Sequence, residues 1–125
     1  MGKHIPFVKA SESKVPVYMP PGHGDTYNRR LIGPADGAKH VELIVGEMGR
    51  TGHAVTHTHT EFEQSMYMLE GKLEVSDSAG NKVFLEPGDS IFFPIGCEHK
   101  VVCLTEKSKF LVIYTPPRQS SKEKV

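Results

Sequence analysis

Residues 57–71 read HTHTEFEQSMYMLEG, and they place two histidines, two glutamates and a glutamine within eight positions, directly before an apolar stretch that ends in glycine. In an extended strand, alternate side chains point to the same face, so His57 and His59 share a face with Cα atoms about 6.6 Å apart. Two imidazoles at this separation can bind one metal ion. A solvent-exposed polar strand edge would carry the same HxH pattern, so the pair alone leaves both readings open.

Gln64 begins a strand in which Met66 and Met68 have the same parity. An amide on the face of two methionines would lie inside a sheet or barrel, where it needs a hydrogen-bond or metal partner. Glu63 has the opposite parity and Glu61 lies in the connection, so both are expected to face solvent or to cap the turn. Gln64 is therefore the side chain that belongs with the histidines.

A second stretch, residues 88–103, reads GDSIFFPIGCEHKVVC. Pro94 and Gly96 predict a tight turn, after which His99 opens a strand and shares a face with Val101 and Cys103. A lone histidine at the start of a strand is usually structural. Here the turn could bring His99 over the HxH pair, which favours a ligand role.

The surrounding sequence predicts eight or more short strands and no helix. Twelve glycines and nine prolines among 125 residues indicate many tight turns. Strands are expected at residues 29–33, 40–48, 54–59, 63–77 with a break at Gly71, 82–89, 90–96, 98–104 and 109–116, with a turn at 49–53. Strands at intervals of about ten residues are typical of an antiparallel sandwich or barrel.

Length and charge narrow the function classes. The chain predicts one domain with an extended segment over 1–35 that packs on the barrel or on a partner subunit, a barrel over 36–116 and a flexible polar tail over 117–125. Fifteen basic and fifteen acidic residues give no electrostatic case for a nucleic-acid or membrane partner. No apolar run is long enough to span a bilayer and no signal peptide opens the chain, so a cytoplasmic protein is expected.

The two stretches together resemble the cupin superfamily, whose motifs are G(X)5HXH(X)3-4E(X)6G and G(X)5PXG(X)2H(X)3N. Gly71 fixes the register of the first motif and puts the family's glutamate ligand on Gln64. The second motif runs from Gly88 through Pro94 and Gly96 to His99. Two positions depart from the pattern, because Cys103 replaces the final asparagine and Thr51 replaces the opening glycine.

The resemblance implies an all-β, double-stranded β-helix (jelly-roll) cupin barrel of the RmlC-like type. It also implies one divalent transition metal, which could be Zn, Ni, Mn, Fe or Cu, held by His57, His59, Gln64 and His99. With the neutral Gln64 in place of glutamate, the site would keep the full +2 charge, bind metal less tightly and attract anionic ligands. Homodimers are common among single-domain cupins, and the N-terminal segment could supply the interface strand.

The superfamily includes several kinds of enzyme as well as non-catalytic binding proteins, so the resemblance leaves the activity open. The ligand set is similar to that of small cupins acting on unsaturated uronates. We expect a metal-dependent isomerase or lyase that acts on a small polar or anionic metabolite such as a keto acid or sugar acid. The alternatives are a metal-dependent dioxygenase and a non-catalytic small-ligand module. Candidate bases are Glu42, His53 and Tyr114, and candidate pocket residues are Met66, Met68, Cys103 and Tyr114.

Overall fold

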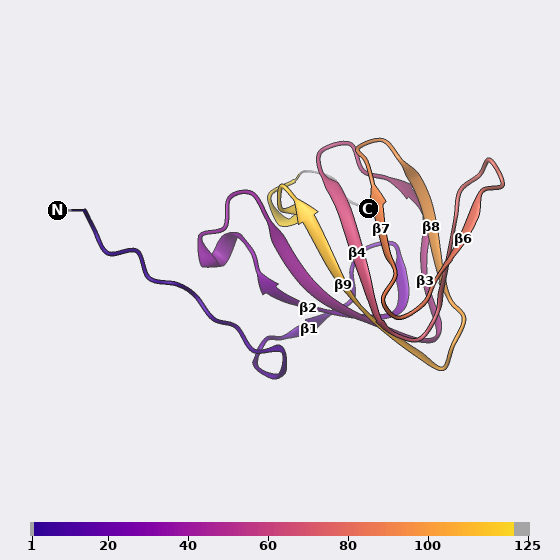
Figure 1. The fold of residues 1–125 in the computed structure, drawn as a ribbon, viewed down its shortest axis with the longest axis horizontal. Helices are drawn as coiled ribbons and strands as arrows, with labels where there is room; N and C mark the ends of the chain where they lie inside the picture. The colour runs from indigo at the N-terminus through magenta and orange to yellow at the C-terminus, as the bar shows by residue number, and fades with distance from the viewer. Residues whose placement is uncertain (1, 122–125) are drawn as a thin grey trace.

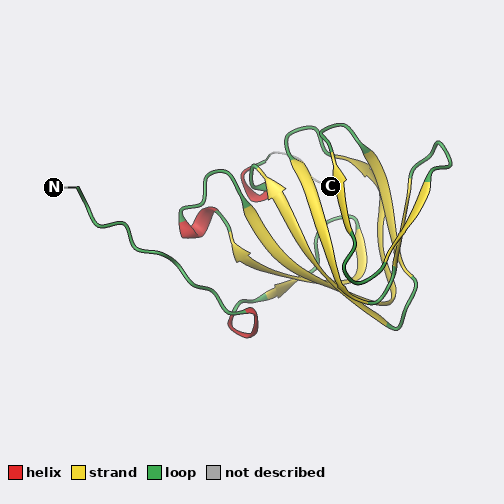
Figure 2. Ribbon diagram, in the orientation of Figure 1, coloured by secondary structure: helices red, strands yellow, loops and turns green. Residues whose placement is uncertain are grey.

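The computed structural model describes residues 2–121, which form a nearly all-β molecule (Figures 1 and 2). Its strands are β1 (Val17–Tyr18), β2 (His23–Ile32), β3 (Glu42–Thr58), β4 (Glu63–Glu70), β5 (Leu73–Ser76), β6 (Lys82–Leu85), β7 (Ser90–Phe93), β8 (Glu98–Cys103) and β9 (Lys107–Thr115). Three 3-10 turns accompany them: η1 (Glu12–Lys14), η2 (Pro34–Asp36) and η3 (Arg118–Ser120). Each has three residues, so within the described chain no helix could cross a membrane.

The long strand β3 joins the two walls of the barrel. Its first part pairs antiparallel with β9, from Glu42 opposite Tyr114 to Gly49 opposite Lys107. Its second part pairs with β8, from His53 opposite Val102 to Thr58 opposite Glu98. The strands follow the order β6-β5-β8-β3-β9-β4-β7, which curls into a nearly closed antiparallel barrel. The predicted jelly-roll fold is confirmed.

The turn expected at residues 49–53 is wrong, because β3 continues through them. Gly52 allows the chain to bend there, since a Cβ atom at that position would collide with the side chain of Met48. The carboxylate of Asp25 on β2 accepts hydrogen bonds from the Thr51 backbone N–H (3.0 Å) and hydroxyl (2.9 Å). A glycine-permitted bend braced by a side chain from the neighbouring strand therefore replaces the expected turn.

The N-terminal segment divides into two parts. β2 belongs to the barrel wall, because it pairs with β3 from His23 opposite Ala54 to Ile32 opposite Leu43. Before η1, the chain has no regular secondary structure and extends away from the barrel (Figure 1). Ile5 and Phe7 in this arm are 85% and 98% exposed. We call residues 2–10 the N-terminal arm.

The C-terminal segment begins with structure where a flexible tail was expected. η3 lies against the barrel, and the Gln119 backbone N–H donates to a carboxylate oxygen of Glu42 at 3.0 Å. Arg118 lies over the rings of Phe62 and Tyr114. The part of the expected tail at 122–125 lies outside the described residues.

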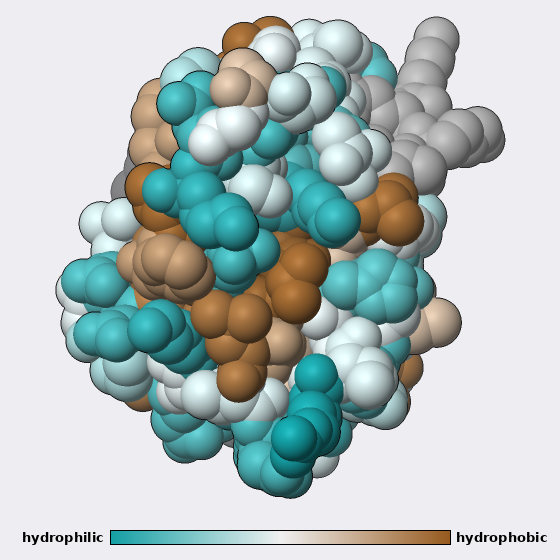
Figure 3. All heavy atoms as spheres, turned by 90° about the vertical axis from the view of Figure 1, so that its right-hand side faces the viewer, coloured by the Kyte–Doolittle hydropathy of each residue, from teal (hydrophilic) through white to brown (hydrophobic). Residues whose placement is uncertain are grey.

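The barrel interior is apolar along most of its length, and its two edge strands β6 and β7 do not pair with each other in the described chain. A groove of about 150 Å³ lies between them, lined by Val83, Ile91 and Phe92 among others. Apolar side chains gather on the face of the molecule toward these strands (Figure 3). Both cysteines are free thiols, with Cys103 buried and Cys97 half-buried.

Candidate metal centre

Three histidines converge inside one end of the barrel. His57 lies near the end of β3, His59 directly after it, and His99 on β8 is the cross-strand partner of His57. Ring centroids are 4.2 Å apart for His57 and His99, 4.6 Å for His57 and His59, and 5.5 Å for His59 and His99. One nitrogen from each ring lies within 4.8 Å of the other two, which is close enough for all three to bind one ion. We call these three residues the imidazole cluster.

Backbone carbonyls orient two of the rings. Nδ1 of His57 lies 2.6 Å from the carbonyl oxygen of Val55, and Nδ1 of His99 lies 3.1 Å from that of Cys97. Such contacts place the proton on Nδ1, so that Nε2 is the ring nitrogen that bears the lone pair. In His99, Nε2 is buried and has no hydrogen-bond partner among the described residues.

Gln64 lines the same cavity as His57 and His99. Its side chain is 7% exposed, and its carbonyl oxygen Oε1 is buried with no hydrogen-bond partner in the described chain. A buried polar atom without a partner costs about 1–3 kcal/mol, so such atoms are uncommon unless a ligand satisfies them. Nitrogen lone pairs and an amide oxygen around one space form a donor set that fits a divalent transition metal.

The two glutamates of the opening stretch lie away from this cavity. Glu61 accepts a hydrogen bond from the Ser121 hydroxyl at 2.8 Å, and Glu63 is 3.5 Å from the Thr115 hydroxyl. Neither residue lines the cavity of the imidazole cluster. Strand parity therefore separates the acidic side chains from Gln64 in the way the sequence predicted.

Burial dominates the electrostatics of the cluster. Desolvation, followed by the charge of His57, lowers the pKa of His99 to about 4. Phe93 stacks on the His99 ring at a centroid distance of 3.9 Å and closes it off from one side. The neutral imidazole that a metal requires is thus the form that the barrel favours.

The cavity at the cluster has a volume of about 20 Å³, space for about one water molecule, and it is partly open to solvent. Two of the expected pocket residues, Met66 and Tyr114, line it together with Val112. The other two, Met68 and Cys103, do not line it and lie in the apolar core instead. Shared strand parity put them inside the barrel, but it did not say how far along the barrel they lie.

The three expected bases have different surroundings. His53 is exposed and lies on Gly24, outside the cavity. Glu42 is buried, but one carboxylate oxygen is 2.5 Å from Nε of Arg30 and the other accepts from the Gln119 N–H. Tyr114 lines the cavity, and burial raises the pKa of its phenol while the nearby Arg118 opposes that shift.

His23 at the start of β2 is a cavity residue that sequence reasoning missed. Its ring centroid is 6.2 Å from that of His57, and its Nδ1 lies 2.8 Å from the carbonyl oxygen of Pro21. Burial lowers its pKa to about 4. No local pattern marks this histidine, which follows two prolines and a glycine, because its position depends on the pairing of β2 with β3.

A family model described as "Cupin domain" matches residues 40–114, and no curated protein matches the sequence. The fold is similar to the polyketide cyclase RemF from Streptomyces resistomycificus, with a TM-score of 0.75 and 27% identity over 98% of this chain and 89% of that one. It is similar to KdgF from Halomonas sp., with a TM-score of 0.77 and 18% identity over 90% and 96% of the two chains. It is also similar to a predicted oxalate decarboxylase from Thermotoga maritima, with a TM-score of 0.75 and 18% identity over 87% of this chain and 99% of that one.

Proposed function

The chain belongs to the cupin family, and on that premise we propose that it is a divalent-metal-dependent enzyme that moves a proton on a small acid containing a carbonyl group. Isomerases that move a carbonyl group and lyases that eliminate a group beside one share this chemistry, because both remove a proton from the carbon next to the carbonyl. The observation that carries the proposal is the buried, unpartnered carbonyl oxygen of Gln64 in the cavity of the imidazole cluster.

The residues that would hold the metal are His57, His59, His99 and Gln64, with Gln64 binding through Oε1. When bound there, a divalent ion would act as a Lewis acid towards a substrate carbonyl. Gln64 is neutral, so the ligand set would leave the whole charge of the ion to act on the substrate. The metal could be zinc, nickel, manganese, iron or copper, since imidazole suits several of them.

His23 is the group we assign to proton transfer. Its Nδ1 contacts a carbonyl oxygen, so the proton resides there and Nε2 bears a lone pair. His23 lines the cavity beside the imidazole cluster but is not one of its three members. Nε2 can therefore accept a proton from a substrate and return it at another carbon.

Apolar side chains make up much of the cavity wall, which would favour a substrate with an apolar part. Met66, Val112 and Phe110 line it together with the polar groups Thr26 and Asn28. Similarity to a structure named as a polyketide cyclase supports carbonyl chemistry, because a polyketide carries carbonyl groups along its carbon chain. These side chains would exclude water and orient the carbonyl towards the imidazole cluster.

The test is hydrogen–deuterium exchange at carbon, which reports proton removal without knowledge of the product. Zinc-, nickel-, manganese- and iron-loaded protein is incubated in D2O with a panel of keto acids and sugar acids, and exchange beside the carbonyl is followed by NMR. We expect His23→Ala to lose exchange while keeping its metal. His53→Ala is the matched control, since that exposed histidine lies outside the cavity.

The same samples distinguish the other two functions. Oxygen consumption that depends on substrate and iron, without exchange in anaerobic solution, would replace the proposal with a dioxygenase. Saturable binding of an acid with neither exchange nor oxygen uptake would replace it with a binding module.

We also propose that the protein forms a homodimer in which the N-terminal arm of each copy packs on the other. The arm exposes Ile5, Phe7 and Val8, and single chains rarely leave such apolar side chains unburied on an extended segment. Light scattering on the full chain and on a chain lacking residues 2–10 tests this, since a truncated chain that remains a dimer contradicts the role of the arm.

A further inference from the structure

A second cavity adjoins that of the imidazole cluster. It has a volume of about 200 Å³, and it shares Asn28 and Tyr114 with the first cavity. Its other walls include the two arginines Arg30 and Arg118, from β2 and η3. A molecule held at the imidazole cluster that extended past Tyr114 would therefore meet these guanidinium groups.

The two arginines differ in how their charge is compensated. Nε of Arg30 is 2.5 Å from a carboxylate oxygen of Glu42, and one terminal nitrogen donates to the Tyr18 hydroxyl at 3.1 Å. Arg118 forms no ion pair with a carboxylate of residues 2–121, and its Nη2 atom is buried without a hydrogen-bond acceptor there. A buried donor without a partner is costly, and more so when it is charged. Arg118 is thus the uncompensated cation of this cavity.

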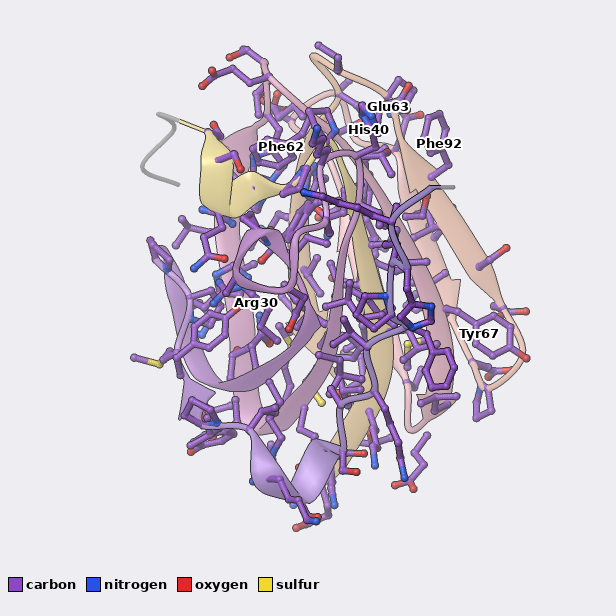
Figure 4. All side chains as sticks on the ribbon, turned by 90° about the vertical axis from the view of Figure 1, so that its left-hand side faces the viewer. Arg30, His40, Phe62, Glu63, Tyr67 and Phe92 are labelled. Carbon is purple, nitrogen blue, oxygen red and sulfur yellow. The ribbon has the colours of Figure 1, made fainter. Side chains whose placement is uncertain are left out.

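Aromatic rings link Arg118 to the imidazole cluster. The guanidinium carbon lies 5.9 Å from the ring centroids of both Phe62 and Tyr114. These rings lie 4.3 Å and 6.1 Å from that of His59. Figure 4 shows Phe62 beside the C-terminal turn η3, which carries Arg118. The positive charge also reaches the first cavity, where it contributes to the lowered pKa of His23.

We propose that Arg118 binds the carboxylate of the substrate, so that the second cavity is a carboxylate subsite and the carbonyl end of the same molecule lies at the imidazole cluster. Only the placement of the carbonyl end at the imidazole cluster rests on the proposed function. A planar guanidinium donates two parallel hydrogen bonds to a carboxylate. One uncompensated positive charge matches one carboxylate, whereas a doubly charged phosphate would need a second free cation, and Glu42 already neutralises Arg30.

Because the guanidinium is separated from His59 by an aromatic ring, the carboxylate must be several bonds from the carbonyl. The probes are therefore 5-oxohexanoate and its neutral methyl ester, which differ only in the charge at the far end. Binding of each is measured by calorimetry or ligand-observed NMR to metal-free and zinc-loaded protein. We expect the wild type to prefer the acid, and Arg118→Gln to weaken acid binding at least tenfold while leaving ester binding unchanged.

Two further variants make the result interpretable. Arg50→Gln removes the same charge from an arginine whose side chain is 77% exposed, and it should change neither probe. Arg118→Lys keeps the charge and much of the packing on Phe62 and Tyr114 but lacks the planar fork, so it should give an intermediate acid preference. It also serves if Arg118→Gln does not fold. An acid preference that is absent in the wild type, or unaltered in both Arg118 variants, overturns the inference.

Metal content and deuterium exchange distinguish this failure from failure of the proposed function. If the protein binds no metal and catalyses no exchange, but substitution of Arg118 removes its preference for the acid, the carboxylate subsite is supported and the proposed activity is wrong. If the protein binds metal and catalyses exchange, but its preference for the acid does not depend on Arg118, the proposed activity is supported and the carboxylate subsite is wrong.

Discussion

Glu42 and Gln64 lie in one row across the barrel, yet one is satisfied by the protein and the other is not. Both are cross-strand partners of Tyr114, Glu42 from β3 and Gln64 from β4. Their exposed fractions are 1% and 7%. Glu42 has Arg30 on one carboxylate oxygen and the Gln119 N–H on the other. Gln64 has no partner for its carbonyl oxygen within residues 2–121.

The difference teaches that burial of a polar side chain is not by itself a sign of function. Glu42 was expected among the candidate bases, but its hydrogen bonds give it a structural role, because they join Arg30 of β2 and the turn η3 to β3. The unpartnered oxygen of Gln64 identifies the place where a ligand can bind with least competition from the protein.

The largest expected effect is loss of the metal. His57→Ala and His99→Ala each remove one of three convergent imidazoles, and we expect stoichiometric zinc binding to be abolished in both. Metal content after dialysis, determined by elemental mass spectrometry, is the measurement. His53→Ala should retain full occupancy, and full occupancy in the two cluster variants would mean that the ion binds elsewhere.

The second largest effect is expected at Glu42, the buried polar side chain whose hydrogen-bond partners the protein supplies. Glu42→Gln removes the charge from a fully buried carboxylate and leaves Arg30 without its partner, so we expect a loss of about 3 kcal/mol in the free energy of unfolding. Denaturant unfolding measures it, and metal content should be unchanged. Glu106→Gln, which breaks the exposed pair with Arg50, should cost no more than about 0.5 kcal/mol.

Most of the fold and part of the site could be predicted from the sequence, because strand parity and turn residues act locally. The parity of Gln64 with Met66 and Met68 correctly predicted a buried face. His23 and Arg118 could not be found in this way, since each reaches its cavity through contacts between distant segments. The missed bend at residues 49–53 has the same origin, because Asp25 stabilises it from another strand.

The third effect concerns pH, in protein stripped of metal by a chelator. The folded-state pKa of His99 is about 4, below the ordinary value of 6.5, because burial and then the charge of His57 disfavour its protonated form. Between these values the unfolded chain binds the proton and the folded chain does not. The stabilisation is therefore fully present above pH 6.5 and is lost as the pH falls towards 4, by at most about 1.4 kcal/mol per pH unit for one histidine.

Thermal unfolding at pH 7, 6 and 5 measures this slope. His99→Gln cannot titrate and should reduce the slope without removing it, since burial also lowers the pKa of His23 to about 4. An equal slope in the variant and the wild type would mean that folding does not lower the pKa of His99 in the metal-free protein.

The smallest expected effect is also the sharpest test of Gln64. Gln64→Glu adds one negative charge at the atom that we assign to the metal, so we expect the zinc dissociation constant to fall about tenfold, equivalent to about 1.4 kcal/mol. Competition with a chelating dye measures it. The comparison variant is Asn28→Asp, which adds a carboxylate to the same cavity from β2, at another buried side-chain oxygen that has no hydrogen-bond partner in the described chain. If Gln64 coordinates the metal, zinc affinity should rise much more in Gln64→Glu than in Asn28→Asp.

An equal rise in zinc affinity in both variants would mean that the added charge acts through space. An unchanged zinc dissociation constant for Gln64→Glu would mean that this oxygen is not a ligand. In either case, its lack of a partner beside the satisfied Glu42 would need another explanation.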